Sequence, residues 1–261
     1  MKNKFNFTVV ALILVLLLAS CKGDEPDVRT VSDLRNDFAN LSINTGTNDI
    51  TIESLNEGIF WDMRIIVPES ASNTNRVPLI ISLHGAANTN TNLYKDTQCL
   101  LEPGFENLEA VLISPSSKGY LWFEGASQLQ ITAIVDLAKR YLPVDASKVA
   151  ITGYSDGAIG AWFYAQHHTD LFSAAIPISG LYNSADSNGV VRPIQTPIYV
   201  VHGTADQLFN YDTSAALIQQ SIDAGSEITF VSATDLEHYD SCTYVPYLVD
   251  AVTWLEDTVW N

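Results

Sequence analysis

The sequence predicts an α/β fold in which helices cover both faces of a mostly parallel central sheet. Two observations support this prediction. The chain has 261 residues, 47% of them hydrophobic, which is enough for one domain with a sizeable core. Short runs of nearly continuous Val, Ile and Leu alternate along the chain with longer amphipathic segments. Strands of this composition are buried on both faces, which happens when helices cover a parallel sheet.

The first 20 residues are predicted to be a signal peptide rather than part of the fold. Two early lysines precede an apolar run, residues 9–18, that is too short to span a bilayer. Residues 18–21, Leu-Ala-Ser-Cys, resemble the lipobox of bacterial lipoproteins. This resemblance implies that Cys21 carries a lipid anchor to the outer membrane of the cell envelope. The alternative is an N-terminal anchor helix followed by an incidental cysteine.

The elements after residue 20 follow from hydrophobic periodicity. We expect residues 21–45 to form a lipidated tether and an N-terminal helix, and residues 46–261 to form the folded domain. The strands predicted in that domain cover residues 49–55, 59–67, 78–83, 110–114, 149–152, 174–178, 197–201 and 227–232. The predicted helices cover residues 127–141, 158–167, 213–224 and 245–260.

One short stretch, Gly-Tyr-Ser-Asp-Gly at residues 153–157, lies between a predicted strand and a predicted helix. A strand, a G-x-S-x-G turn and a helix together make the nucleophile elbow of α/β-hydrolases. The glycines at both flanks suit a strained turn that has no room for side chains near Ser155. The alternative is an ordinary glycine-rich turn between a strand and a helix.

A serine hydroxyl needs a base to activate it, and the base needs an acid to orient it. In this fold the acid and then the histidine follow the serine along the chain. Asp206 comes just after the predicted strand 197–201, and His238 is the only histidine beyond it. Asp206 could instead be a turn residue, and Asp235 or Asp240 could then be the acid.

An oxyanion hole needs two backbone donors directed at the developing negative charge. Asp156, directly after the serine, is expected to supply one N–H group, and Ala86 the other. Ala86 belongs to the loop that opens with His84 after the strand 78–83. His84 could instead be a metal ligand, but no second candidate ligand lies at a suitable spacing in the sequence, so we predict no metal site.

Residues 145–158 and 169–180 resemble the phospholipase/carboxylesterase branch of the α/β-hydrolases, which includes secreted feruloyl esterases and polyhydroxybutyrate depolymerases. The resemblance implies ester hydrolysis without a cofactor. It also implies that Trp122 and Phe123 line the acyl pocket; Tyr154, beside the serine, is a further predicted substrate-binding residue. Related enzymes commonly have Met or a small residue where this chain has Asp156, whose carboxylate would disfavour anionic substrates.

The segment 179–196 is too short for the helical cap that lipases insert near this position. We therefore expect no cap domain and an open cleft that admits a small or a polymeric ester. The formal net charge of −17 argues against nucleic acid as a partner. Cys99 and Cys242 form an even pair in an oxidising compartment and are predicted to be disulfide-bonded, with two free thiols as the alternative.

These observations predict a monomeric serine esterase that acts on carboxylic esters, such as acyl or feruloyl groups on polysaccharide. A serine peptidase of the prolyl-oligopeptidase type is one alternative, although such enzymes usually carry a large N-terminal β-propeller. A surface glycan-binding protein built on a hydrolase scaffold is another, because exposed tryptophans can stack on sugars. The complete set of Ser, Asp and His favours an enzyme over this last alternative.

Overall fold

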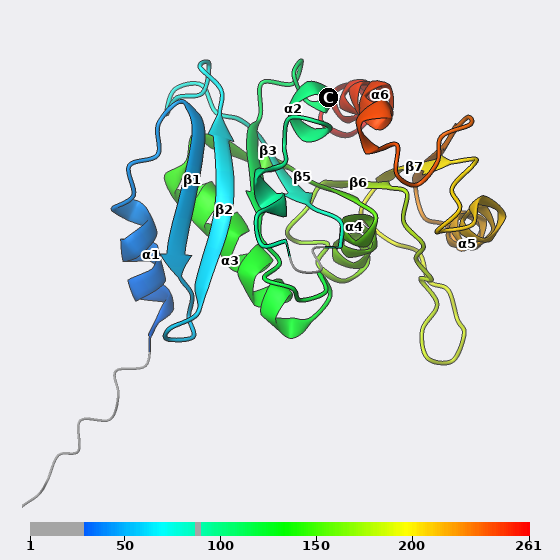
Figure 1. Cartoon of the computed structure of the whole chain (residues 1–261), viewed down its shortest axis with the longest axis horizontal. Coiled ribbons are helices and arrows are strands. Elements are labelled where there is room, and N and C mark those ends of the chain that lie inside the picture. Colours follow the sequence, from blue (N-terminus) through cyan, green and yellow to red (C-terminus); the bar gives the residue numbers. More distant parts are fainter. Residues whose placement is uncertain (1–28, 87–89) are drawn as a thin grey trace, which may run out of the picture.

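The computed structural model describes residues 29–86 and 90–261. The predicted signal peptide and the lipidation of Cys21 lie outside the described residues. The strands are β1 (Gly46–Glu53), β2 (Phe60–Val67), β3 (Val77–Leu83), β4 (Val111–Pro115), β5 (Val144–Tyr154), β6 (Ala174–Ile178), β7 (Ile198–Gly203) and β8 (Ile228–Ala233). The α-helices are α1 (Val31–Ala39), α2 (Leu101–Gly104), α3 (Gly125–Tyr141), α4 (Asp156–His167), α5 (Tyr211–Asp223) and α6 (Val245–Trp254) (Figure 1).

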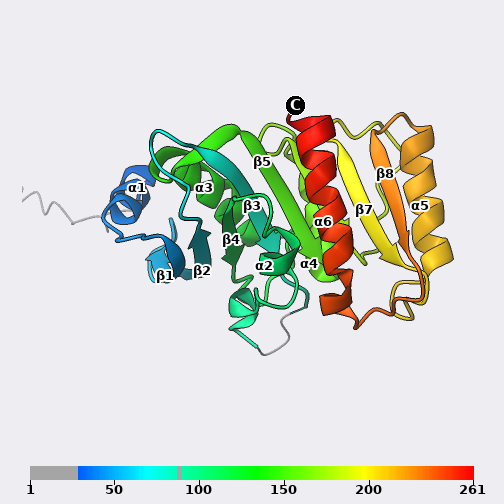
Figure 2. The same ribbon diagram turned by 90° about the horizontal axis from the view of Figure 1, so that it is seen from above.

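The eight strands form one sheet in the order β1-β2-β4-β3-β5-β6-β7-β8, which can be followed across Figure 2. β2 runs antiparallel to both of its neighbours, and all other neighbouring strands are parallel. The carboxyl ends of the parallel strands therefore meet at one edge of the sheet. The loops that leave this edge are where an α/β fold places its chemistry.

The side chains of the central strands alternate between two hydrophobic layers, as the pleat of a strand requires. In β3, Leu79 and Ile81 belong to the layer that also contains buried residues of α1, α3, α4 and α5. Ile80 belongs to the opposite layer, with buried residues of α2 and α6. Figure 1 shows α2 and α6 on one face of the sheet and α3 and α4 on the other. The predicted α/β class, with helices on both faces, is confirmed.

Some bounds differ from the sequence-based expectations. β5 begins at Val144, well before the predicted start at residue 149, because Val144 pairs with Val77 of β3 despite the polar residues that follow it. The helix expected over 245–260 ends at Trp254 and continues as a single π-helical turn, Leu255–Val259. The short helix α2 was not expected, since its four residues are too few to show a helical period.

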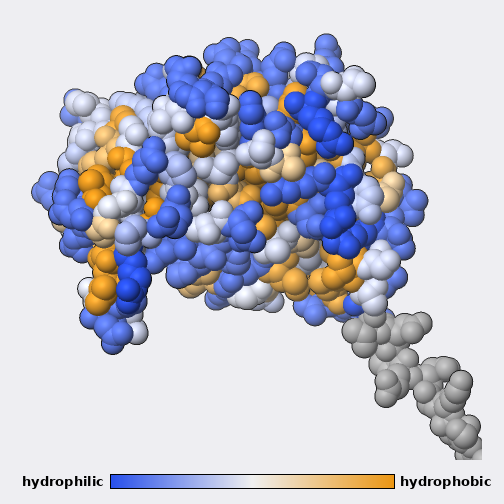
Figure 3. Space-filling view, turned by 180° about the vertical axis from the view of Figure 1, so that it is seen from behind, coloured by the Kyte–Doolittle hydropathy of each residue, from blue (hydrophilic) through white to orange (hydrophobic). Residues whose placement is uncertain are grey.

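Residues 179–197 join β6 to β7 and contain no helix or strand, which agrees with the expected absence of a cap domain. On the face shown in Figure 3, hydrophobic residues are interspersed with hydrophilic ones rather than gathered over one element. Among residues 29–86 and 90–261, no helix is long and apolar enough to cross a membrane.

Candidate active site

Ser155 occupies the sharp turn between β5 and α4, at the carboxyl edge of the sheet. Its backbone has φ 58° and ψ −119°, a conformation that residues other than glycine rarely adopt. Such strain persists only where the surrounding structure enforces it, and it is concentrated at functional sites. The Ser155 side chain reaches the loop that follows β8, where it meets His238.

The two glycines that flank Ser155 are required by close backbone contacts. A Cβ atom on Gly153 would lie 2.1 Å from the carbonyl oxygen of Gly157. A Cβ atom on Gly157 would lie 1.9 Å from the carbonyl oxygen of Leu83, at the end of β3. Real Cβ atoms do not approach backbone so closely, so only glycine fits at either position.

The structure brings Ser155, His238 and Asp206 together from three separate loops. The Oγ atom of Ser155 lies 2.9 Å from Nε2 of His238, and Nδ1 of His238 lies 2.9 Å from Oδ2 of Asp206. All three residues are buried. A histidine that donates its Nδ1 hydrogen to a carboxylate presents an unprotonated Nε2 to the serine hydroxyl, which is the arrangement needed to remove its proton.

Asp206 is fixed by the turn that follows β7. Its Oδ1 atom accepts hydrogen bonds from the backbone N–H groups of Leu208 and Phe209, at 2.9 and 2.7 Å. Nε2 of His202 lies 3.6 Å from Oδ2, but burial lowers the pKa of His202, so that ring is neutral at pH 7. Asp206 therefore forms no ion pair with His202. Asp235 and Asp240, the alternative acids, make no hydrogen bond to His238 among the described contacts.

The expected oxyanion donors lie on the other side of the serine. A Cβ atom on Gly85 would be 3.4 Å from Cβ of Ser155, so the loop after β3 passes directly beside the serine. Ala86 follows in that loop. Asp156 is the first residue of α4, and the N–H groups of a first helical turn have no acceptor within the helix. The positive end of the helix dipole adds to their attraction for an anion.

His84 and Trp122 hold this loop, a role that sequence reasoning did not assign to either. Nδ1 of His84 donates to the carbonyl oxygen of Gly85 at 2.6 Å, and its Nε2 accepts from the N–H group of Ser117 at 3.1 Å. Burial lowers the pKa of His84, which keeps the ring neutral. The indole N–H of Trp122 donates to the carbonyl oxygen of His84 at 2.9 Å.

Two cavities lie on either side of the segment Gly85–Ala86. The larger, of about 460 Å³, is lined by Ser155, His238 and Tyr154, together with Leu93, Leu100, Leu101, Ile178, Leu208, Tyr239 and Leu248. The smaller, of about 190 Å³, is lined by Asp156, Ser117 and Tyr120, together with Gly119, Leu121 and Trp122. A mostly apolar cavity with a few convergent polar groups is typical of a small-molecule site.

The expected acyl-pocket residues are therefore not brought together at the larger cavity. Trp122 is only 2% exposed, donates a hydrogen bond to the carbonyl oxygen of His84 and lines the smaller cavity. Phe123 is 41% exposed and packs against Phe163 of α4, and it lines neither cavity. Tyr154 does line the larger cavity, beside the ring of His238.

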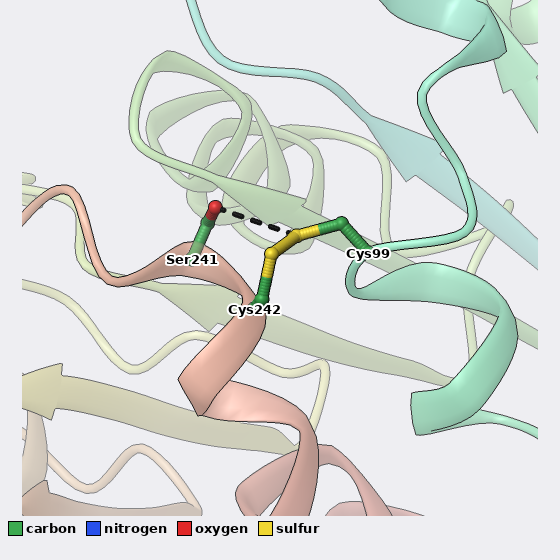
Figure 4. The surroundings of a disulfide bond; sticks show 3 residues. All are labelled: Cys99, Ser241 and Cys242. Carbon is green, nitrogen blue, oxygen red and sulfur yellow. Dashed lines mark hydrogen bonds between the residues drawn. A yellow bond between two sulfur atoms is a disulfide. The ribbon is translucent and has the colours of Figure 1, made fainter.

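A disulfide joins Cys99 to Cys242, whose Cα atoms are 4.9 Å apart (Figure 4). Cys99 precedes α2, and Cys242 lies in the 3₁₀ turn Ser241–Tyr244 that follows His238 and leads into α6. Cys99 also lines the larger cavity, as does Ser241. The bond therefore ties the loop that carries Ala86 to the loop that carries His238.

We expect reduction of this disulfide to lower both the thermal midpoint and the activity. The two cysteines are 143 residues apart, and chain entropy for a loop of that length gives about 4–5 kcal/mol of stabilisation, less any strain. Thermal melts and ester hydrolysis, with and without reductant, measure the two effects. A Cys99→Ser, Cys242→Ser double variant is the control, since reductant should not change it. Two freely alkylated cysteines in native, never-reduced protein would contradict the bond.

Known proteins resemble this chain in sequence and in fold. Residues 121–239 match the sequence profile of the family described as the dienelactone hydrolase family. A bifunctional acetylxylan esterase/xylanase, XynS20E of Neocallimastix patriciarum, is 25% identical over 157 residues, which are 59% of this chain and 23% of that protein. The chain thus spans less than a quarter of that relative.

Two solved structures illustrate the likeness of fold. A thermostable esterase superposes with a TM-score of 0.65 at 20% identity, covering 81% of this chain and 62% of that one. FphF, a fluorophosphonate-binding serine hydrolase of Staphylococcus aureus, superposes with a TM-score of 0.66 at 15% identity, covering 81% and 99%. Together with the strand order and the serine turn, these likenesses show that the chain has the α/β-hydrolase fold.

Proposed function

We propose that the protein is a serine esterase that cleaves carboxylic esters through an acyl-enzyme intermediate, and that its substrates are polysaccharides that carry acyl esters. The main support for this reaction is the pair of hydrogen bonds that connects Ser155 to His238 and His238 to Asp206. Ser155 and His238 line a cavity of about 460 Å³. Each link is 2.9 Å long, within the range for proton transfer.

The proposed reaction has two steps. Ser155 Oγ attacks the ester carbonyl carbon while His238 Nε2 takes the hydroxyl proton, and the carbonyl oxygen becomes an oxyanion facing the N–H groups of Ala86 and Asp156. The carbon–oxygen bond to the alcohol then breaks, and His238 returns the proton to the leaving alkoxide. Water, deprotonated by His238, then attacks the acyl-serine carbonyl. The bond from the acyl carbon to Ser155 Oγ breaks, the acid leaves, and His238 returns the proton to Ser155 Oγ. Asp206 stabilises the imidazolium in both steps.

Three observations support a polysaccharide ester as the substrate. The relative from Neocallimastix patriciarum bears the name of an acetylxylan esterase/xylanase. The segment 179–197 forms no cap over the site, so a bulky alcohol group can approach. The carboxylate of Asp156 lies beside the expected oxyanion hole and favours neutral substrates, such as acetylated or feruloylated sugars, over anionic ones.

A matched panel of substrates tests this proposal. The wild-type protein and the Ser155→Ala variant would be compared on p-nitrophenyl acetate, acetylated xylo-oligosaccharide, methyl ferulate and an aminoacyl p-nitroanilide. We expect serine-dependent hydrolysis of esters and no cleavage of the anilide. Cleavage of the anilide alone would instead make the protein a peptidase. Binding of xylo-oligosaccharide without any ester hydrolysis would make it a glycan-binding protein.

We further propose that the mature chain is attached through Cys21 to the outer membrane of a bacterial envelope and acts there as a monomer. Support comes from the sequence pattern of residues 1–21 alone. Incorporation of labelled palmitate into the full chain tests the anchor, and an unlabelled, fully soluble product would overturn it.

A further inference from the structure

Tyr239 is exposed at the edge of the larger cavity although it follows His238 directly. Its side chain is 74% exposed, the highest value among the large hydrophobic side chains of the described residues. Its ring stands at 88° to the ring of His238, with the centroids 5.3 Å apart. Most of this aromatic ring stays in water, so its large apolar area remains available to a ligand.

The chemistry decides which part of a substrate reaches Tyr239. Because His238 must return a proton to the leaving alkoxide, the alcohol half of the ester has to lie next to Nε2 of His238. Leu208 and Tyr239 both line the larger cavity, and both are exposed. They lie in the turns that carry Asp206 and His238 respectively. The alcohol half therefore leaves the site across these two side chains.

One polar side chain is held close to His238. Oε1 of Gln207 accepts a hydrogen bond from the backbone N–H group of His238 at 3.2 Å, which orients the exposed amide and leaves its NH₂ group as a donor. A sugar ring presents a face of C–H groups and an edge of hydroxyl groups, which an aromatic ring with an amide nearby can match.

We infer that Tyr239, with Leu208 and Gln207, forms a subsite for the sugar ring that carries the ester, and that Tyr239 determines specificity for this alcohol. The inference rests on the proposed esterase function. It assigns the sugar to the His238 side of the site. The smaller cavity, with the exposed Tyr120, lies beyond Gly85–Ala86 and does not include His238.

Two substrates with the same acyl group test the subsite. Acetylated xylotriose offers a sugar as the leaving alcohol, whereas ethyl acetate offers one too small to reach Tyr239. We expect Tyr239→Ala to raise KM for acetylated xylotriose about tenfold with little change in kcat, because contact with one aromatic ring is lost. The loss on ethyl acetate should be much smaller. Tyr239→Trp keeps an aromatic face and should retain most of the affinity for the sugar ester.

Tyr120→Ala is the matched control, since this tyrosine is also exposed, at 52%, but lies at the other cavity. It should leave the KM for acetylated xylotriose unchanged. Equal losses of Tyr239→Ala on both substrates would overturn the inference, because Tyr239 would then act by positioning His238. A larger effect of Tyr120→Ala than of Tyr239→Ala would also overturn it. Failure of the wild-type protein to cleave either ester would instead refute the esterase function itself.

Discussion

Replacement of Ser155 by alanine is expected to lower the turnover of p-nitrophenyl acetate by about 10⁴-fold or more. The variant has no nucleophile for an acyl-enzyme, and only the oxyanion donors and substrate binding remain to accelerate attack by water. Alanine keeps the Cβ atom and removes only the hydroxyl group that lies 2.9 Å from Nε2 of His238. The fold should therefore persist, and circular dichroism and the thermal midpoint check this.

The same variant allows the dependence of the three residues on one another to be measured. Adding His238→Ala to Ser155→Ala should cost almost nothing further, since groups that act as a unit are strongly non-additive. A fluorophosphonate probe should label the wild-type protein at Ser155 and leave the variant unlabelled. Ser241→Ala is a matched control, because Ser241 lines the same cavity without contacting His238. Retention of more than about a tenth of the activity by Ser155→Ala would move the nucleophile elsewhere.

Much of this site could be predicted from the sequence because its determinants are local. The left-handed turn at Ser155 needs small neighbours, and the 1.9 Å approach of a Cβ on Gly157 to the backbone of Leu83 explains why glycine stands there. Asp206 and His238 each follow a strand of the sheet, and parallel strands bring their carboxyl ends to one edge. Chain order was therefore sufficient to select the residues that the structure places together.

Other features depend on packing between distant segments, which no local pattern reports. The motif that contains Trp122 indicated an acyl pocket, whereas the indole is buried and hydrogen-bonded to the carbonyl of His84. The division of the site into two cavities arises from the path of the loop at Gly85–Ala86. The early start of β5 depends on the pairing of Val144 with Val77, which lies 67 residues earlier in the chain. This pairing is determined by the register of the strands in the sheet and not by local composition.

Replacement of Asp206 by asparagine is expected to lower kcat/KM for p-nitrophenyl acetate by about 10³–10⁴-fold while leaving the fold intact. The amide oxygen can still accept the backbone hydrogen bonds of Leu208 and Phe209, so the turn is maintained. The amide NH₂ group would then face Nδ1 of His238, where the carboxylate now lies at 2.9 Å. That contact favours the tautomer with hydrogen on Nε2, which cannot accept the proton of Ser155.

Asp235→Asn and Asp240→Asn are the matched controls for this prediction, because the same change of charge is made in the loop that carries His238. Neither carboxylate contacts His238: Oδ2 of Asp240 accepts from the backbone N–H group of Glu237, and Asp235 lies exposed at the preceding turn. Each control should keep activity within about threefold of wild type, since neither carboxylate contacts His238 and the asparagine oxygen can still accept the hydrogen bond that Asp240 makes. If Asp206→Asn stayed active while Asp235→Asn or Asp240→Asn lost activity, the acid of the site would be that other aspartate, and the hydrogen bond from His238 to Asp206 would serve the fold alone.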